Sequence, residues 1–66
     1  MQIEIGGVYL SKSGEIINII SEDLPYDGRR VFIDDIGRSY FGNGAYYYDE
    51  SSKHSLVGEF GGNDND

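Results

Sequence analysis

The chain has no cysteine, no tryptophan and a single proline among its 66 residues. Without cysteine, neither a disulfide framework nor a thiolate metal site can hold so small a fold together. A chain of this length buries only about 60% of the surface that its unfolded form exposes, so we expect no deep substrate cavity. Stability must come from a core of aliphatic residues, phenylalanine and tyrosine, or from homo-oligomerisation.

Long apolar runs are also missing. No stretch reaches the length of a transmembrane helix, and the first ten residues, MQIEIGGVYL, lack the basic and apolar regions of a signal peptide. No window of a dozen residues carries an apolar period of 3.6. We therefore expect a soluble, cytoplasmic protein with almost no helix.

Basic residues are few, with five against twelve acids, and the formal net charge is −7. This balance favours basic partners and disfavours nucleic acid and anionic membranes. The acids are spread along the chain, and charges closer than a Debye length of about 8 Å reinforce one another against a basic groove. The alternative is an acidic surface that serves solubility alone.

Ten glycines separate short runs of β-branched and aromatic residues, which is the pattern of an all-β domain. Strands are predicted at 2–10, 15–22, 30–36, 38–41, 45–49 and 56–60, the first of them interrupted by two glycines. Closing such a sheet removes its exposed edges. We expect a small five-stranded antiparallel SH3-like barrel over residues 1–60, with one short helical turn at 50–55. Residues 61–66, GGNDND, are expected to form a disordered acidic tail.

The stretch SYFGNGAYYYDE, residues 39–50, predicts a hairpin whose register the turn decides. A two-residue turn at Asn43 and Gly44 places Phe41 opposite Tyr46. A three-residue turn with Gly44 in the left-handed conformation places Tyr40 there instead. Both registers remain open at this point.

The second arm of this hairpin predicts which tyrosines face a partner. Strand alternation puts Tyr46 and Tyr48 on the inner face and Tyr47 on the outer one. Tyrosine surrounded by polar groups is typical of an interface anchor. The predicted partner-binding site is Tyr47 with an acidic rim of Asp34, Asp35, Asp49 and Glu50.

Catalytic and metal sites are not predicted. His54 has Ser52 and Ser55 as neighbours, but groups on one short turn diverge and cannot form a catalytic triad. Adjacent acids in a strand point to opposite faces, so neither acid pair chelates an ion by itself. We expect no enzyme activity, no metal and no cofactor, and we expect His54 to close its turn with a side-chain hydrogen bond.

A series of short glycine-based motifs runs through residues 6–60. Its members are Gly7 with Tyr9, Gly14 with Ile16, Gly37 with Tyr40, Asn43 and Gly44 with Tyr46, and His54 with Leu56 and Val57. This series resembles a loose group of small phage and prophage proteins of unknown function, in which an aspartate usually stands where this chain has Ser55. The resemblance implies a phage-encoded accessory protein acting in the host cytoplasm, and it supplies no catalytic residue.

Charge and resemblance together predict a non-enzymatic acidic protein-binding module, an inhibitor that occupies the groove of a basic host protein of nucleic-acid handling or defence. The alternative is a nucleic-acid-binding barrel that combines surface tyrosines with Arg29, Arg30 and Arg38. Phosphate binding depends on local positive charge, which favours the first prediction.

Overall fold

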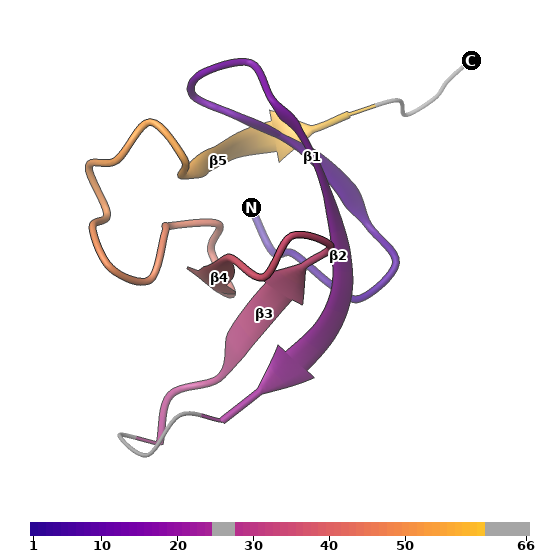
Figure 1. The fold of residues 1–66 in the computed structure, drawn as a ribbon, viewed down its shortest axis with the longest axis vertical. Coiled ribbons are helices and arrows are strands. Elements are labelled where there is room, and N and C mark those ends of the chain that lie inside the picture. The colour runs from indigo at the N-terminus through magenta and orange to yellow at the C-terminus, as the bar shows by residue number, and fades with distance from the viewer. Residues whose placement is uncertain (25–27, 61–66) are drawn as a thin grey trace.

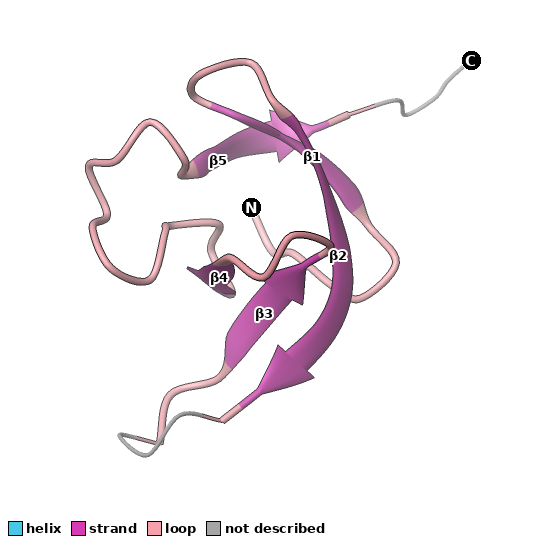
Figure 2. Ribbon diagram, in the orientation of Figure 1, coloured by secondary structure: helices cyan, strands magenta, loops and turns pink. Residues whose placement is uncertain are grey.

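Five antiparallel strands form one curled sheet in the computed structural model, which describes residues 1–24 and 28–60 (Figure 1). They are β1 (Val8–Ser11), β2 (Ile16–Asp23), β3 (Val31–Asp34), β4 (Ser39–Phe41) and β5 (Leu56–Glu59), in the spatial order β4-β3-β2-β1-β5. The described residues contain strands and loops but no helix (Figure 2). The predicted all-β class is confirmed, and the expected acidic tail, 61–66, lies outside the described residues.

Strand β2 belongs to both halves of the sheet. Its first part pairs with β1, where Tyr9 lies opposite Ile17, and its second part pairs with β3, where Phe32 lies opposite Glu22. Within the pairing with β3 the register shifts between Ile19 and Ser21, and an irregularity of this kind bends a strand and increases its twist. In Figure 1, β2 curves from β1 down to β3. The sheet is therefore a half-barrel with a concave inner face.

The core fills this concave face. Its buried members are Ile3, Tyr9, Ile17, Ile19, Phe32, Tyr40 and Leu56, and Tyr46 packs against them. Strand alternation explains the inward positions of β1 and β2, because Tyr9 and Ile17 are buried while their neighbours along the chain are more exposed. Each strand contributes to this core. The side chains are Tyr9 from β1, Ile17 and Ile19 from β2, Phe32 from β3, Tyr40 from β4 and Leu56 from β5.

The N-terminal segment crosses the concave face without joining the sheet as a strand. The predicted strand began at residue 2, whereas β1 begins at Val8. Gly6 has φ of +89° and turns the chain before β1, so the preceding residues leave the sheet direction. Ile3 is then free to enter the core, and its N–H donates to the carbonyl oxygen of Gly42 at 2.9 Å.

The hairpin after β4 adopts the three-residue register. Gly44 has φ of +95°, Phe41 N–H donates to the Ala45 carbonyl at 2.8 Å, and Tyr40 pairs with Tyr46. This pairing is an isolated bridge, so the strand predicted at 45–49 is wrong. The reason is that the Gly44 carbonyl accepts the Leu56 N–H at 2.8 Å, and the chain turns away from β4 after the Tyr47 N–H has donated to the Ser39 carbonyl at 2.9 Å.

Residues 46–55 form three successive turns in place of the predicted helical turn. Asp49 N–H donates to the Tyr46 carbonyl at 3.3 Å, Ser52 N–H to the Asp49 carbonyl at 2.9 Å, and Ser55 N–H to the Ser52 carbonyl at 3.1 Å. Side chains of Asp49 and Ser52 accept the N–H groups of Ser51 and His54. Such local bonds compete with helix, and the structure does not confirm the helical turn predicted at 50–55.

Candidate protein-interaction surface

A continuous row of aromatic rings runs along the loop between β4 and β5. Ring centroids lie 5.3 Å apart for Phe41 and Tyr47, 5.0 Å for Tyr47 and Tyr48, 5.7 Å for Tyr48 and Tyr46, and 5.3 Å for Tyr46 and His54. Tilted and edge-to-face contacts at this spacing are favourable beyond the area they bury. We call these five residues the aromatic row.

The row is fixed to the core and to the backbone of its neighbours. The Tyr46 ring lies 5.9 Å from that of Tyr40, which is fully buried. Tyr46 N–H donates to Ser55 Oγ at 2.9 Å, and Tyr47 N–H donates to the Ser39 carbonyl at 2.9 Å. A partner would therefore meet rings that are already ordered, which lowers the entropy cost of binding.

Exposure within the row differs from the sequence prediction. Tyr46 packs against the core as predicted, but Tyr48 is 75% exposed and its predicted inward position is wrong. Tyr47 is half-buried, with its ring against Phe41. Because residues 47 and 48 lie in a turn, the alternation of a strand does not apply to them.

Two of the predicted rim acids follow the row directly. Asp49 and Glu50 are both exposed. The Asp49 Oδ1 atom accepts the Ser51 hydroxyl at 2.8 Å and the Ser51 N–H at 3.0 Å, and these hydrogen bonds hold the pKa of Asp49 below its usual value. Asp35 is also exposed but lies in the turn between β3 and β4, where its N–H donates to the Asn18 carbonyl at 3.1 Å.

Asp34 lies in the interior and cannot belong to an exposed rim, so its predicted place there is wrong. Asp34 is 1% exposed, and its Oδ2 atom accepts a hydrogen bond from the Tyr40 hydroxyl at 2.7 Å. Its Oδ1 atom accepts the N–H groups of Ile36 and Arg38 at 3.0 and 2.8 Å. Burial raises the pKa of Tyr40, and the hydrogen bond to Asp34 raises it further. Asp34 therefore organises the turn between β3 and β4 from inside.

The side chain of His54 reaches Glu15 instead of closing its own turn, contrary to the prediction. Its Nδ1 atom is buried and lies 3.5 Å from Glu15 Oε1, which is an electrostatic contact longer than a good hydrogen bond. Arg38 Nη1 donates to the same oxygen at 2.9 Å, and this bond is the main cause of the lowered Glu15 pKa. The turn is closed by Ser55, whose hydroxyl donates to the Glu50 carbonyl at 2.9 Å.

The three arginines of the alternative prediction are not gathered into one basic patch. Arg30 pairs with Glu22 at 3.3 Å, and Arg38 pairs with Glu15. The guanidinium carbon of Arg29 lies 4.5 Å from the centroid of the Phe41 ring, within the range of a cation–π contact. Of the three, Arg29 is the one that stacks on a ring of the aromatic row.

Among residues 1–24 and 28–60, no group of three or more histidine and acidic side chains could hold a metal ion. Within the same described ranges, no helix has the length and apolar character to cross a membrane. In comparisons with known proteins, no family model, curated protein or solved structure matches the chain.

Sequence reasoning missed Phe41 and Tyr48 as parts of this surface. A usable signal was present in the run after Tyr48, DESSKHS, because aspartate and serine side chains favour turns through bonds to nearby backbone N–H groups. That composition indicates that strand alternation stops there. The stacking of Phe41 on Tyr47 carries no such local signal, because the two rings belong to different arms of the loop.

Proposed function

We propose that this chain is a non-enzymatic protein-binding module whose aromatic row contacts a basic partner protein. The observation that carries the proposal is the unbroken contact of five rings that are half-buried or exposed, with Tyr48 75% exposed. Aromatic side chains held in place are typical centres of binding energy in protein interfaces. Asp49 and Glu50 supply a negative margin that complements a basic surface.

The proposed partner is a basic host protein that handles nucleic acid or acts in defence, and the proposed role is its inhibition. A net charge of −7 supports this choice, because an acidic domain is attracted to a groove that binds phosphates. The resemblance to small phage and prophage proteins supports a phage origin and action in the host cytoplasm. The bend of β2 and the order of the five strands support assignment of the half-barrel as SH3-like.

Nucleic-acid binding is the second candidate, and the stacking of Arg29 on Phe41 favours it. Aromatic rings with a neighbouring guanidinium can stack bases and meet phosphates. However, Arg30 and Arg38 are paired with glutamates, and each pair cancels positive charge that phosphate binding needs. The acidic protein-binding role is therefore the stronger proposal.

The test compares capture of proteins from the lysate of a bacterial host by the wild type and by Tyr48→Ala. Because Tyr48 is mostly exposed, its loss should change stability by no more than about 0.5 kcal/mol. Capture of a basic protein should weaken at least about fivefold, which corresponds to roughly 1 kcal/mol. Ile36→Ala, which also removes an exposed apolar side chain, at 65% exposure, is the matched control and should retain the partner.

Salt and nucleic acid complete the test. Binding to the basic partner should weaken as salt is raised, because screening reduces attraction between exposed charges. Equal capture by the wild type and Tyr48→Ala would exclude the aromatic row as the contact surface. Micromolar binding of labelled DNA or RNA at low salt, lost in an Arg29→Ala variant, would replace the proposal with the second candidate.

A further inference from the structure

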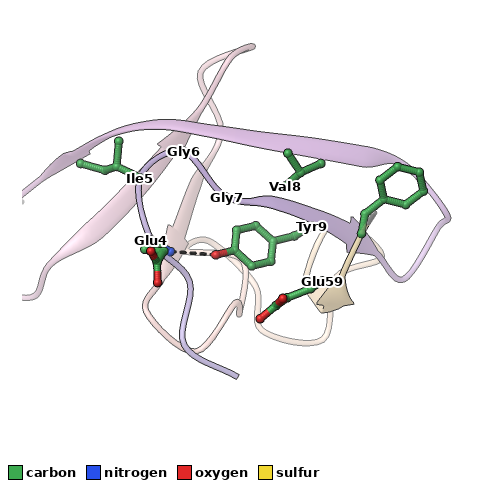
Figure 3. Close-up of a pocket in the computed structure, with 8 residues that line it drawn as sticks. Glu4, Ile5, Gly6, Gly7, Val8, Tyr9 and Glu59 are labelled. Carbon is green, nitrogen blue, oxygen red and sulfur yellow. Dashed lines mark hydrogen bonds between the residues drawn. The ribbon is translucent and has the colours of Figure 1, made fainter. Parts of the chain in front are cut away.

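A groove of about 430 Å³ opens beside β1, at a place separate from the aromatic row (Figure 3). The chain before β1 forms one wall, with Glu4 and Ile5, and the end of β5 forms the other, with Glu59 and Phe60. Tyr9 lies between the two walls. The volume of the groove is in the range that holds a small ligand or one or two side chains.

Two glycines build the groove. Gly6, with its positive φ, reverses the chain, and its N–H donates to the Ile19 carbonyl at 2.8 Å. Gly7 leaves room for an aromatic ring, because a Cβ atom at this position would lie 2.6 Å from two carbons of the Tyr9 ring. The Tyr9 hydroxyl can then reach the Glu4 N–H, from which it accepts a hydrogen bond at 2.9 Å.

The charged groups of the groove are two glutamates. Tyr9 lies opposite Glu59 in the pairing of β1 with β5, and Glu4 lies beside the hydroxyl end of the Tyr9 ring in Figure 3. Both residues are exposed, and within the described part of the chain neither carboxylate has an ion-pair partner. A cation that enters the groove is attracted to both carboxylates.

The Tyr9 hydroxyl adds an unused hydrogen-bond donor to these charges. Tyr9 is 3% exposed, and its hydroxyl accepts from Glu4. Among the residues that the structure describes, no acceptor takes the proton of this hydroxyl. The hydroxyl therefore keeps donor capacity for an acceptor atom that enters the groove.

We infer that this groove binds an arginine side chain, with its backbone carbonyl, from an extended segment of a basic protein. The guanidinium is placed between the carboxylates of Glu4 and Glu59, because it is planar and donates several charge-assisted hydrogen bonds at once. Ile5 and Phe60, 50% and 45% exposed, are the apolar side chains at the two ends of the groove. A carbonyl of the bound segment accepts from Tyr9. The inference rests on the proposed function for the class of partner, but it uses a second surface.

The test titrates the ¹⁵N-labelled full chain with a blocked pentapeptide that carries one arginine between alanines. A second peptide replaces arginine by citrulline, which keeps the shape of the side chain and removes its charge. The arginine peptide should cause saturable shifts in the backbone amide signals of residues 4–9 and of Glu59, with at least tenfold tighter binding than the citrulline peptide. Equal binding of the two peptides, or shifts confined to other residues, would overturn the inference.

Two double variants separate the groove from overall charge. Glu4→Gln with Glu59→Gln should weaken binding of the arginine peptide at least tenfold. Glu22→Gln with Asp23→Asn also changes the net charge of the chain from −7 to −5, but at the far end of β2. This double variant should change binding of the arginine peptide less than twofold. Equal losses in the two double variants would show general attraction and exclude the groove. The comparison of arginine with citrulline on the wild type needs no variant to fold.

The outcomes also distinguish this inference from the proposed function. Loss of partner capture by Tyr48→Ala, together with no binding of the arginine peptide, would overturn the groove and leave the aromatic row in place. Specific binding of the arginine peptide, together with full capture by Tyr48→Ala, would support the groove and overturn the role of the row.

Discussion

Removing the hydroxyl of Tyr40 is the most direct test of the buried contact between β4 and Asp34. In Tyr40→Phe, the ring keeps its place in the core, where Tyr40 is fully buried, and the 2.7 Å hydrogen bond to Asp34 Oδ2 is lost. No solvent replaces the missing donor easily, because Asp34 is 1% exposed. The perturbation is therefore limited to one hydrogen bond on one buried carboxyl group.

The expected loss is about 2 to 3 kcal/mol of unfolding free energy. Hydrogen bonds to charged groups contribute roughly 1.5 to 3 kcal/mol to stability. The cost of leaving a buried acceptor without its donor lies toward the upper end of this range. A domain of this size has only about 3 to 10 kcal/mol in total. The melting temperature should therefore fall by roughly 8 to 20 °C.

Tyr9→Phe is the matched control, because it removes a hydroxyl from a second buried tyrosine. There the partner is the neutral N–H of Glu4, which belongs to an exposed residue and can bind water instead. The expected loss is about 0.5 to 1 kcal/mol. Both variants remove the same hydroxyl from a tyrosine ring. The difference between their losses of unfolding free energy therefore measures the effect of the buried carboxyl group of Asp34.

Urea unfolding of both variants supplies the measurement, and a double-mutant cycle with Asp34→Asn measures how far the contact depends on the carboxylate, because the Nδ2 that replaces Oδ2 can donate to the Tyr40 hydroxyl. Asparagine keeps Oδ1 as acceptor for the Ile36 and Arg38 N–H groups, so the turn is retained. A loss below about 0.5 kcal/mol in Tyr40→Phe, or a coupling of zero in the cycle, would refute the role of Asp34 as a buried organiser.

The same contact gives a signature at alkaline pH. Burial, and then the bond to Asp34, raise the pKa of Tyr40 above its ordinary value of 10.0. A group whose pKa is raised on folding contributes stability below its unfolded pKa and loses it as the pH rises further. The wild type should therefore lose stability above pH 10.0, and Tyr40→Phe should lack this component of the loss.

Three further predictions concern local geometry and acid stability. Gly44→Ala should cost about 2 to 4 kcal/mol in urea unfolding, because φ is +95° and the new Cβ would lie 3.2 Å from the Leu56 carbonyl oxygen; a cost below about 1 kcal/mol would contradict this. Gly7→Ala should cost about 1 to 3 kcal/mol and shift the Glu4 amide signal by displacing the ring beneath it; an unchanged Glu4 signal would show that the ring stays in place. The hydrogen bond from Arg38 lowers the pKa of Glu15 below 4.5, so the stability that this bond contributes is present above that pH and is lost as the pH falls below it. Glu15→Gln should remove this acid sensitivity from thermal melts, and an unchanged sensitivity would contradict the prediction.

Local chemistry in the sequence determined the secondary-structure class and most turns. Short runs of β-branched and aromatic residues between glycines predict strands, because each signal is contained within a few residues. The glycine at position 44 adopts the left-handed conformation that one of the two predicted registers requires. Net charge and the absence of cysteine also need no structure, since they do not depend on which residues meet.

Tertiary contacts decided the positions of side chains that look alike in the sequence. Asp34 and Asp35 are adjacent and chemically identical, yet the first is buried because the Tyr40 hydroxyl reaches it from the neighbouring strand. Tyr48 is exposed because bonds from Gly44 to Leu56 and along the serine-rich turns direct the loop away from β4.

The groove was also invisible in the sequence, since Glu4 and Glu59 come from opposite ends of the chain. They meet only because β5 pairs with β1 and the segment before β1 turns back at Gly6. Hydrophobic pattern and turn chemistry act over a few residues, whereas these contacts depend on which strand edges and ring faces the folded chain brings together.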